Sequence, residues 1–163
     1  MKAIVSASAI ALSLIASAAS AQAVRTEKNM SLELANQIAA ATVAACSASN
    51  YNVTVAVVDR AGTLRALQRA DNAGPHTVGA AQGKAFTSAS AKAPTTAMLE
   101  NVQKNPGAAT LVDIPGFLIL GGGVPVKVGN EVIGAVGVGG APGGHLDEQC
   151  ANAGIAKVAD LLK

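Results

Sequence analysis

Two histidines are candidates for chemistry because their settings in the chain match. His76 follows Gly74-Pro75 and His145 follows Gly143-Gly144, and each comes just before a predicted helix. The start of a helix disfavours positive charge and so favours the neutral imidazole, which is the form that binds iron. For either ring, the alternative interpretation is an ordinary solvated or capping residue.

Charged residues nearby make His76 the stronger candidate. Arg69, Asp71 and Lys84 lie close to it in sequence, and Lys84 comes about two helical turns later, so Lys84 and His76 can share one helix face. A cation there could hold a carboxylate, such as a haem propionate. The alternative is a surface ion-pair set of Arg69, Asp71 and Lys84, which would contribute little to stability.

General catalytic motifs are missing from the sequence. It contains no G-x-S-x-G, no H-E-x-x-H and no Walker loop. The segment GAVGVGGAPGGH looks like a dinucleotide-binding loop, but Pro142 stands where the third glycine belongs when the pattern starts at Gly137. Asp147 and Glu148 lie in the first turn of the last predicted helix, where the helix dipole alone accounts for acidic residues.

The sequence contains two cysteines, Cys46 and Cys150, whose spacing matches no zinc or haem-attachment motif. They could form a disulfide between the first and last predicted helices, or they could remain buried free thiols. A bridge that closes a loop of about 100 residues contributes roughly 4–5 kcal/mol in the chain-entropy model. The sequence leaves both states open.

The first 21 residues have the pattern of a secretory signal. A positive start precedes an apolar run from Ala9 to Ala18, and small residues suit cleavage after Ala21 or Ala23. We therefore expect a periplasmic or secreted protein with one domain over residues 22–163; an N-terminal core helix is the alternative. No later stretch reaches the length of a membrane span, which predicts no membrane insertion.

The composition argues against nucleic acid as a partner. The chain has 12 Lys and Arg against 10 Asp and Glu, a net charge of +2 that falls by one when the leader is removed. Such a balance is no electrostatic footprint for nucleic acid. With no Trp, one Tyr and two Phe, the chain also lacks stacking platforms for single strands.

The elements that must position these residues are helices and β-branched strands. Short turns between consecutive strands imply an antiparallel sheet with helices covering it, an α/β architecture. Ser31 can cap the first helix, and Thr95 or Thr96 can cap the third. The expected elements are a helix over 31–50, strands over 53–58 and 63–69, helices over 76–93 and 95–104, three strands within 114–140, and a helix over 145–162.

Two long stretches carry a resemblance to a known family. They begin VTVAVVDRAGTLRALQRADNAGPHTVGAAQGKAFTSAS and GGGVPVKVGNEVIGAVGVGGAPGGHLDEQCANAGIAKV. Together they resemble the GlcG/HbpS-like haem-binding family, which includes the C-terminal domain of PduO-type corrinoid adenosyltransferases. The resemblance covers about residues 31–163. Asn72 departs from the family pattern, which often has glycine there.

This resemblance implies both a fold and a function. The fold is a profilin-like sandwich, with a five-stranded antiparallel sheet and helices on both faces, assembled as a homo-oligomer. The function is haem binding, for sensing or storage of haem or iron. Haem ligation varies within the family, so the resemblance itself assigns no axial ligand. From the residues described above, we expect His76 to be the iron ligand, with Arg69 and Lys84 near the propionates, Asp71 beside them, and Gly121, Gly122 and Gly123 shaping the pocket edge.

Two other interpretations stay open. In one, the protein is a binding protein or enzyme for a small carboxylate metabolite, where Arg69 and Lys84 hold the acid and Asp71 or His76 moves a proton. In the other, it is an accessory oligomer whose glycine-rich segments make subunit contacts.

Overall fold

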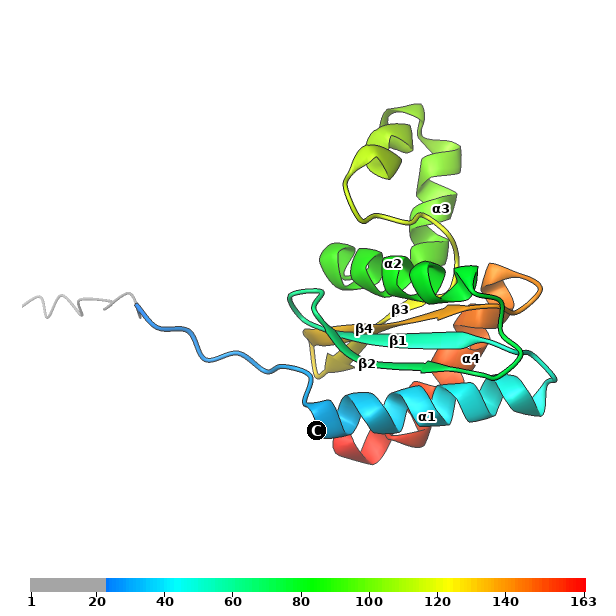
Figure 1. Cartoon of the computed structure of the whole chain (residues 1–163). Helices are drawn as coiled ribbons and strands as arrows, with labels where there is room; N and C mark the ends of the chain where they lie inside the picture. The colour runs from blue at the N-terminus through cyan, green and yellow to red at the C-terminus, as the bar shows by residue number, and fades with distance from the viewer. Residues whose placement is uncertain (1–22) are drawn as a thin grey trace, which may run out of the picture.

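The computed structural model describes residues 23–163 of the chain. The predicted leader, residues 1–21, lies outside these described residues. Figure 1 shows a central sheet with helices on both faces, and helix α3 (Thr95–Lys104) and the 3₁₀ helix η1 (Pro106–Asp113) standing away from the sheet. The elements in chain order are α1 (Leu32–Ala48), β1 (Thr54–Asp59), β2 (Leu64–Arg69), α2 (His76–Ala91), α3 (Thr95–Lys104), η1 (Pro106–Asp113), β3 (Gly123–Val128), β4 (Glu131–Gly139), α4 (Gly144–Lys157) and η2 (Ala159–Leu161).

The sheet of the described part has four antiparallel strands in the order β2-β1-β4-β3. The predicted antiparallel sheet is therefore confirmed, but the expected fifth strand over 114–120 is wrong. Pro115 has no N–H to donate to a ladder, and Gly116 has a φ of +85°. The chain turns at these two residues, and the N–H of Phe117 donates to the carbonyl of Ile114 at 3.0 Å.

Alternate residues of β1 point to opposite faces of the sheet and divide the core in two. The face toward α1 and α4 holds valines such as Val55 and Val57, whereas the face toward α2 is built from alanines such as Ala56. Small side chains let α2 lie close to the sheet. A Cβ added at Gly137 would lie 2.0 Å from the carbonyl oxygen of Ala81, so only glycine fits there.

No helix among residues 23–163 is long and apolar enough to cross a bilayer.

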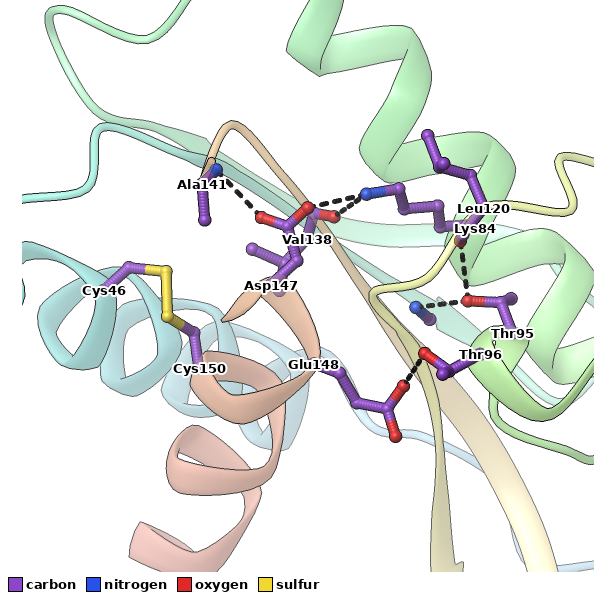
Figure 2. Close-up of polar contacts among 11 residues, drawn as sticks. Cys46, Lys84, Thr95, Thr96, Leu120, Val138, Ala141, Asp147, Glu148 and Cys150 are labelled. Carbon is purple, nitrogen blue, oxygen red and sulfur yellow. Dashed lines mark hydrogen bonds and ion pairs between the residues drawn. A yellow bond between two sulfur atoms is a disulfide. The ribbon is translucent and has the colours of Figure 1, made fainter. Parts of the chain in front are cut away.

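On the sheet face opposite α2, contacts from two successive turns of α4 hold this helix against α1. Cys46 of α1 and Cys150 of α4 form a disulfide with their Cα atoms 5.3 Å apart (Figure 2), which decides between the two states that the sequence left open. One turn later in α4, Gly154 packs against Thr42. A Cβ at Gly154 would lie 1.9 Å from the Thr42 hydroxyl oxygen, so the helix backbones approach closely.

The helix ends show which capping predictions hold. The predicted N-cap at Ser31 is confirmed, since its hydroxyl accepts the N–H of Leu34 at 3.1 Å. The predicted cap of α3 by a threonine is wrong, because Pro94 occupies the N-cap. Instead, the Thr95 hydroxyl donates to the carbonyl of Leu120 and accepts the N–H of Gly123, each at 2.8 Å. Thr95 thereby fixes the segment that leads into β3.

Candidate functional site

A cleft of about 300 Å³ opens at the end of the sheet where β4 finishes and where α2 and α4 both begin. Two helix starts therefore border the same space, which favours anionic groups in it. The cleft is lined by His76, Thr77, Ala80, Lys84, Leu120, residues 139–144 and Asp147.

One face of α2 supplies the functional side chains of the cleft. His76, Ala80 and Lys84 are four residues apart, so they lie on one helix face, and all three line the cleft. The expectation that His76 and Lys84 share a face is confirmed. His76 is exposed, whereas Lys84 is only 2% exposed.

A buried ion pair crosses from α2 to α4 beside the cleft (Figure 2). The Lys84 Nζ lies 2.7 Å from the Asp147 Oδ2 and donates to the carbonyl of Val138 at 2.8 Å. The N–H of Ala141 donates to the Asp147 Oδ1 at 3.0 Å. One carboxylate therefore joins α2, α4 and the loop over 140–143 that borders the cleft.

Sequence reasoning missed the role of Asp147. Its place in the first turn of a helix suggested nothing beyond the helix dipole, but the structure buries it against a lysine 63 positions away. Burial raises the pKa of the Asp147 carboxyl above its ordinary value of 3.8, and this outweighs the hydrogen bond and charge of Lys84 and the hydrogen bond from Ala141. The signal in the sequence was an acidic residue one turn before Cys150.

Arg69 and Asp71 do not join His76 and Lys84 in the cleft. An Nη2 proton of Arg69 is donated to the carbonyl of Ala73, which ties the end of β2 to the following turn. Asp71 is exposed in that turn and does not line the cleft. Among the described residues, Lys84 pairs with Asp147 instead, so the alternative of a surface ion-pair set of Arg69, Asp71 and Lys84 is wrong.

Gly121 and Gly122, which precede β3, and Gly123, its first residue, are buried beneath the ion pair. Gly122 has a φ of +117°, and a Cβ there would lie 2.7 Å from the Asp147 Cβ. A Cβ at Gly123 would lie 2.4 Å from the Lys84 carbonyl oxygen. Gly121 packs against Gly144 in the same way. These glycines let the backbone pass close to the ion pair. Of this segment, Leu120 lines the cleft and the three glycines do not.

A second polar cleft, of about 320 Å³, adjoins the first at His76. Asn50, Tyr51, Asn52 and Asn72 line it, together with residues that border both clefts. The side chains of these four residues are hydrogen-bonding groups without formal charge. The imidazole of His76 thus stands between a compartment with a buried ion pair and a compartment of amides and a phenol.

His145 occupies a matching position without lining the first cleft. It lies in the first turn of α4 and is exposed, as His76 is in α2. Each ring lies against a preceding glycine: a Cβ at Gly74 would lie 2.7 Å from His76 Cε1, and one at Gly143 2.8 Å from His145 Cε1. No hydrogen bond or ion pair joins either imidazole to another of residues 23–163. The two rings therefore differ chiefly in the residues that surround them.

An apolar pocket of about 320 Å³ lies on another face of α2, and sequence reasoning did not anticipate it. Phe86 lines it and stacks edge-on to Phe117, with ring centroids 6.2 Å apart. The remaining lining is Val58, Gly62, Leu64, Gln82, Gly83 and Gly116.

No group of three or more His, Cys, Asp or Glu residues suited to a metal ion occurs in the part that the structure describes.

Comparison with known proteins identifies a family. The sequence model described as "Haem degrading protein HbpS-like" matches residues 30–156. Protein GlcG of Escherichia coli strain K12 is 38% identical over 114 residues, which cover 70% of this chain and 84% of GlcG.

Solved structures show the same fold. A double mutant of HbpS from Streptomyces reticuli superposes with a TM-score of 0.79 and 38% identity, covering 94% of this chain and 98% of that one. A complex of PduOC with haem superposes with a TM-score of 0.70 and 25% identity, covering 78% of this chain and 94% of that one.

Proposed function

The chain belongs to the HbpS-like family, and on this premise we propose that it binds haem at the cleft, with His76 as a ligand of the iron. One observation carries the proposal: an exposed imidazole lies between two polar clefts and has no hydrogen-bonding partner among residues 23–163. Iron in haem accepts a ligand nitrogen of this kind. That PduOC was crystallised with haem on a related fold supports the same choice.

The residues around His76 suit the acidic edge of a haem. Neither α2 nor α4 has a side-chain N-cap. The N–H groups of Thr77 and Leu146 already donate to the carbonyls of Gly74 and Gly143, which among residues 23–163 leaves those of His76, Gly144 and His145 for carboxylates. Lys84 is balanced by Asp147, so we assign it to positioning the cleft rather than to holding a propionate. A cleft of about 300 Å³ accepts one edge of a porphyrin, and the remainder would extend along the adjoining compartment.

Titration with haemin, followed at the Soret band, tests this proposal. We expect a saturable shift for the wild type and an affinity lower by about tenfold or more for His76→Ala, since removing the ligand removes a bond to iron. His145→Ala is the matched control, because that exposed ring also begins a helix but lies outside the cleft lining.

Two results would contradict the assignment. The absence of any saturable shift in the wild type would exclude haem binding. Equal affinities for His76→Ala and the wild type would exclude His76 as the ligand, and a selective loss in His145→Ala would move the site to α4.

A small carboxylate metabolite is the second candidate ligand. The observation that favours it is the lining of the cleft, where neither phenylalanine contributes and two helix starts meet. Thermal shift against hydroxy and keto acids, with haemin in parallel, separates the two candidates. Stabilisation by an acid without a saturable haemin shift would support the metabolite.

We also propose that the chain is exported to the periplasm or outside the cell, and that it acts as a homo-oligomer in haem or iron sensing or storage. The disulfide supports export, since such bonds persist in oxidising compartments. N-terminal sequencing of the protein from cell fractions tests the location and the cleavage after Ala21 or Ala23. Light scattering tests the oligomer. A cytoplasmic protein that keeps its first residues, or a monomer, would contradict these two proposals.

A further inference from the structure

The disulfide lies one helical turn from the cleft along α4. Cys150 is three residues after Asp147, the carboxylate that holds both Lys84 and the N–H of Ala141 (Figure 2). The position of this turn of α4 therefore sets the position of the ion pair and of the loop at the cleft. Whatever fixes Cys150 also fixes these contacts.

A second path joins the disulfide to the other compartment. The carbonyl of Cys46 accepts the N–H of Tyr51 at 3.0 Å, just after the end of α1. Tyr51 lines the polar cleft that contains His76, and it also lines a crevice beside Cys150. Both halves of the disulfide thus contact residues that border the proposed ligand site.

The same crevice makes the two sulfur atoms unequal. It has a volume of about 180 Å³, and Cys150 lines it together with Leu146 and Gln149. Cys150 is 6% exposed, whereas Cys46 is 0% exposed. A thiol entering from solvent therefore reaches the sulfur of Cys150 before that of Cys46.

We propose that the Cys46–Cys150 disulfide is a reducible clamp on the cleft, opened by a dithiol reductant that attacks Cys150. The reductant's thiolate would form a mixed disulfide with the Cys150 Sγ, and Cys46 would leave as a thiolate. The second thiol of the reductant then displaces Cys150, so the reductant is oxidised to its disulfide and the protein gains two thiols. The release of α4 lowers the affinity of the cleft for its ligand. The effect on affinity rests on the proposed haem binding; the choice of sulfur does not.

Trapping with a monothiol tests which sulfur is attacked. The folded protein is treated with 2-mercaptoethanol, quenched with acid, alkylated and mapped by mass spectrometry. We expect the adduct on Cys150 and an alkylated Cys46. An adduct mainly on Cys46, or no reduction without denaturant, would overturn the proposal.

Ligand affinity tests the clamp itself. We expect haemin to bind the reduced protein, and the Cys46→Ala/Cys150→Ala variant, about tenfold more weakly than the oxidised protein. Val128→Ala is the matched control for lost stability, because Val128 is buried at the opposite end of β3 from the cleft. The control should keep its affinity, and equal affinities for the oxidised and reduced protein would overturn the clamp.

A readout without haem separates this proposal from the previous one. Hydrogen exchange at the N–H of Ala141, which donates to Asp147, should accelerate on reduction but not in Val128→Ala. If the oxidised protein shows no Soret shift while the exchange responds, haem binding fails and the clamp stands. If exchange at Ala141 is unchanged by reduction, the clamp fails whatever the haemin result.

Discussion

The cleft and the apolar pocket lie on different faces of the same helix, and they have almost the same size, about 300 and 320 Å³. They differ in chemistry. The cleft has an exposed imidazole, two helix starts and a buried ion pair, whereas the pocket has Phe86 against Phe117 and a single polar side chain, Gln82. Volume therefore does not distinguish the two as sites for an iron-containing dicarboxylate. Our proposal of the cleft rests on its imidazole and on the helix starts that border it.

The largest expected effect in this comparison comes from the buried ion pair. Asp147→Ala leaves the Lys84 charge buried without its partner, so we expect the free energy of unfolding to fall by about 3–5 kcal/mol. The double variant Lys84→Met/Asp147→Leu should recover most of this loss, because it removes both charges. Urea denaturation measures both variants. A loss below about 1 kcal/mol in Asp147→Ala would show that the lysine reaches water once the carboxylate is gone.

The apolar pocket should show the opposite profile, with a stability effect and no effect on haemin. Phe86→Ala removes a half-buried ring that touches Phe117 and the glycines on either side. We expect a loss of about 2 kcal/mol in the free energy of unfolding and an unchanged Soret titration. A haemin affinity that falls more in Phe86→Ala than in His76→Ala would move the site to the pocket and reverse the comparison.

The smallest effect is the dependence of stability on pH. Because burial raises the pKa of Asp147 above 3.8, the folded protein holds this proton to higher pH than the unfolded chain does. The contribution of this carboxyl to stability is therefore complete below 3.8 and is lost as the pH rises through the folded value. The free energy of unfolding of the wild type, minus that of Asp147→Asn, should fall as the pH rises above 3.8. A rising difference would show that Lys84 outweighs burial.

Local patterns in the sequence predicted the parts of the site that lie on one element. The spacing of His76 and Lys84 placed them on one face of α2, and the run of β-branched residues placed β1 in the core. Contacts between distant elements left no such local signal. The pairing of Lys84 with Asp147 depends on how α4 packs, and the bridge from Cys46 depends on the crossing of α1 with α4.

Backbone chemistry explains the errors in the predicted elements. Residues 114–120 are apolar enough for a strand, but Pro115 and Gly116 turn the chain before a ladder can form. Arg69 was expected near the propionates of a haem, whereas its guanidinium donates to the carbonyl of Ala73 in the turn after β2. In both cases a short-range backbone effect overrode the pattern of side chains.

The segment before α1 is fastened to the end of the sheet that lies opposite the cleft. Arg60, in the turn between β1 and β2, donates to the carbonyl of Lys28 at 2.9 Å and pairs with Glu27 at 3.3 Å, and the N–H of Met30 donates to Ile133. Figure 1 shows this segment leaving the sandwich at the far end from the loop that precedes α4. An affinity tag or a surface anchor attached ahead of Glu27 would therefore lie at the end of the sheet away from the cleft, and the cleft would face away from the tagged surface.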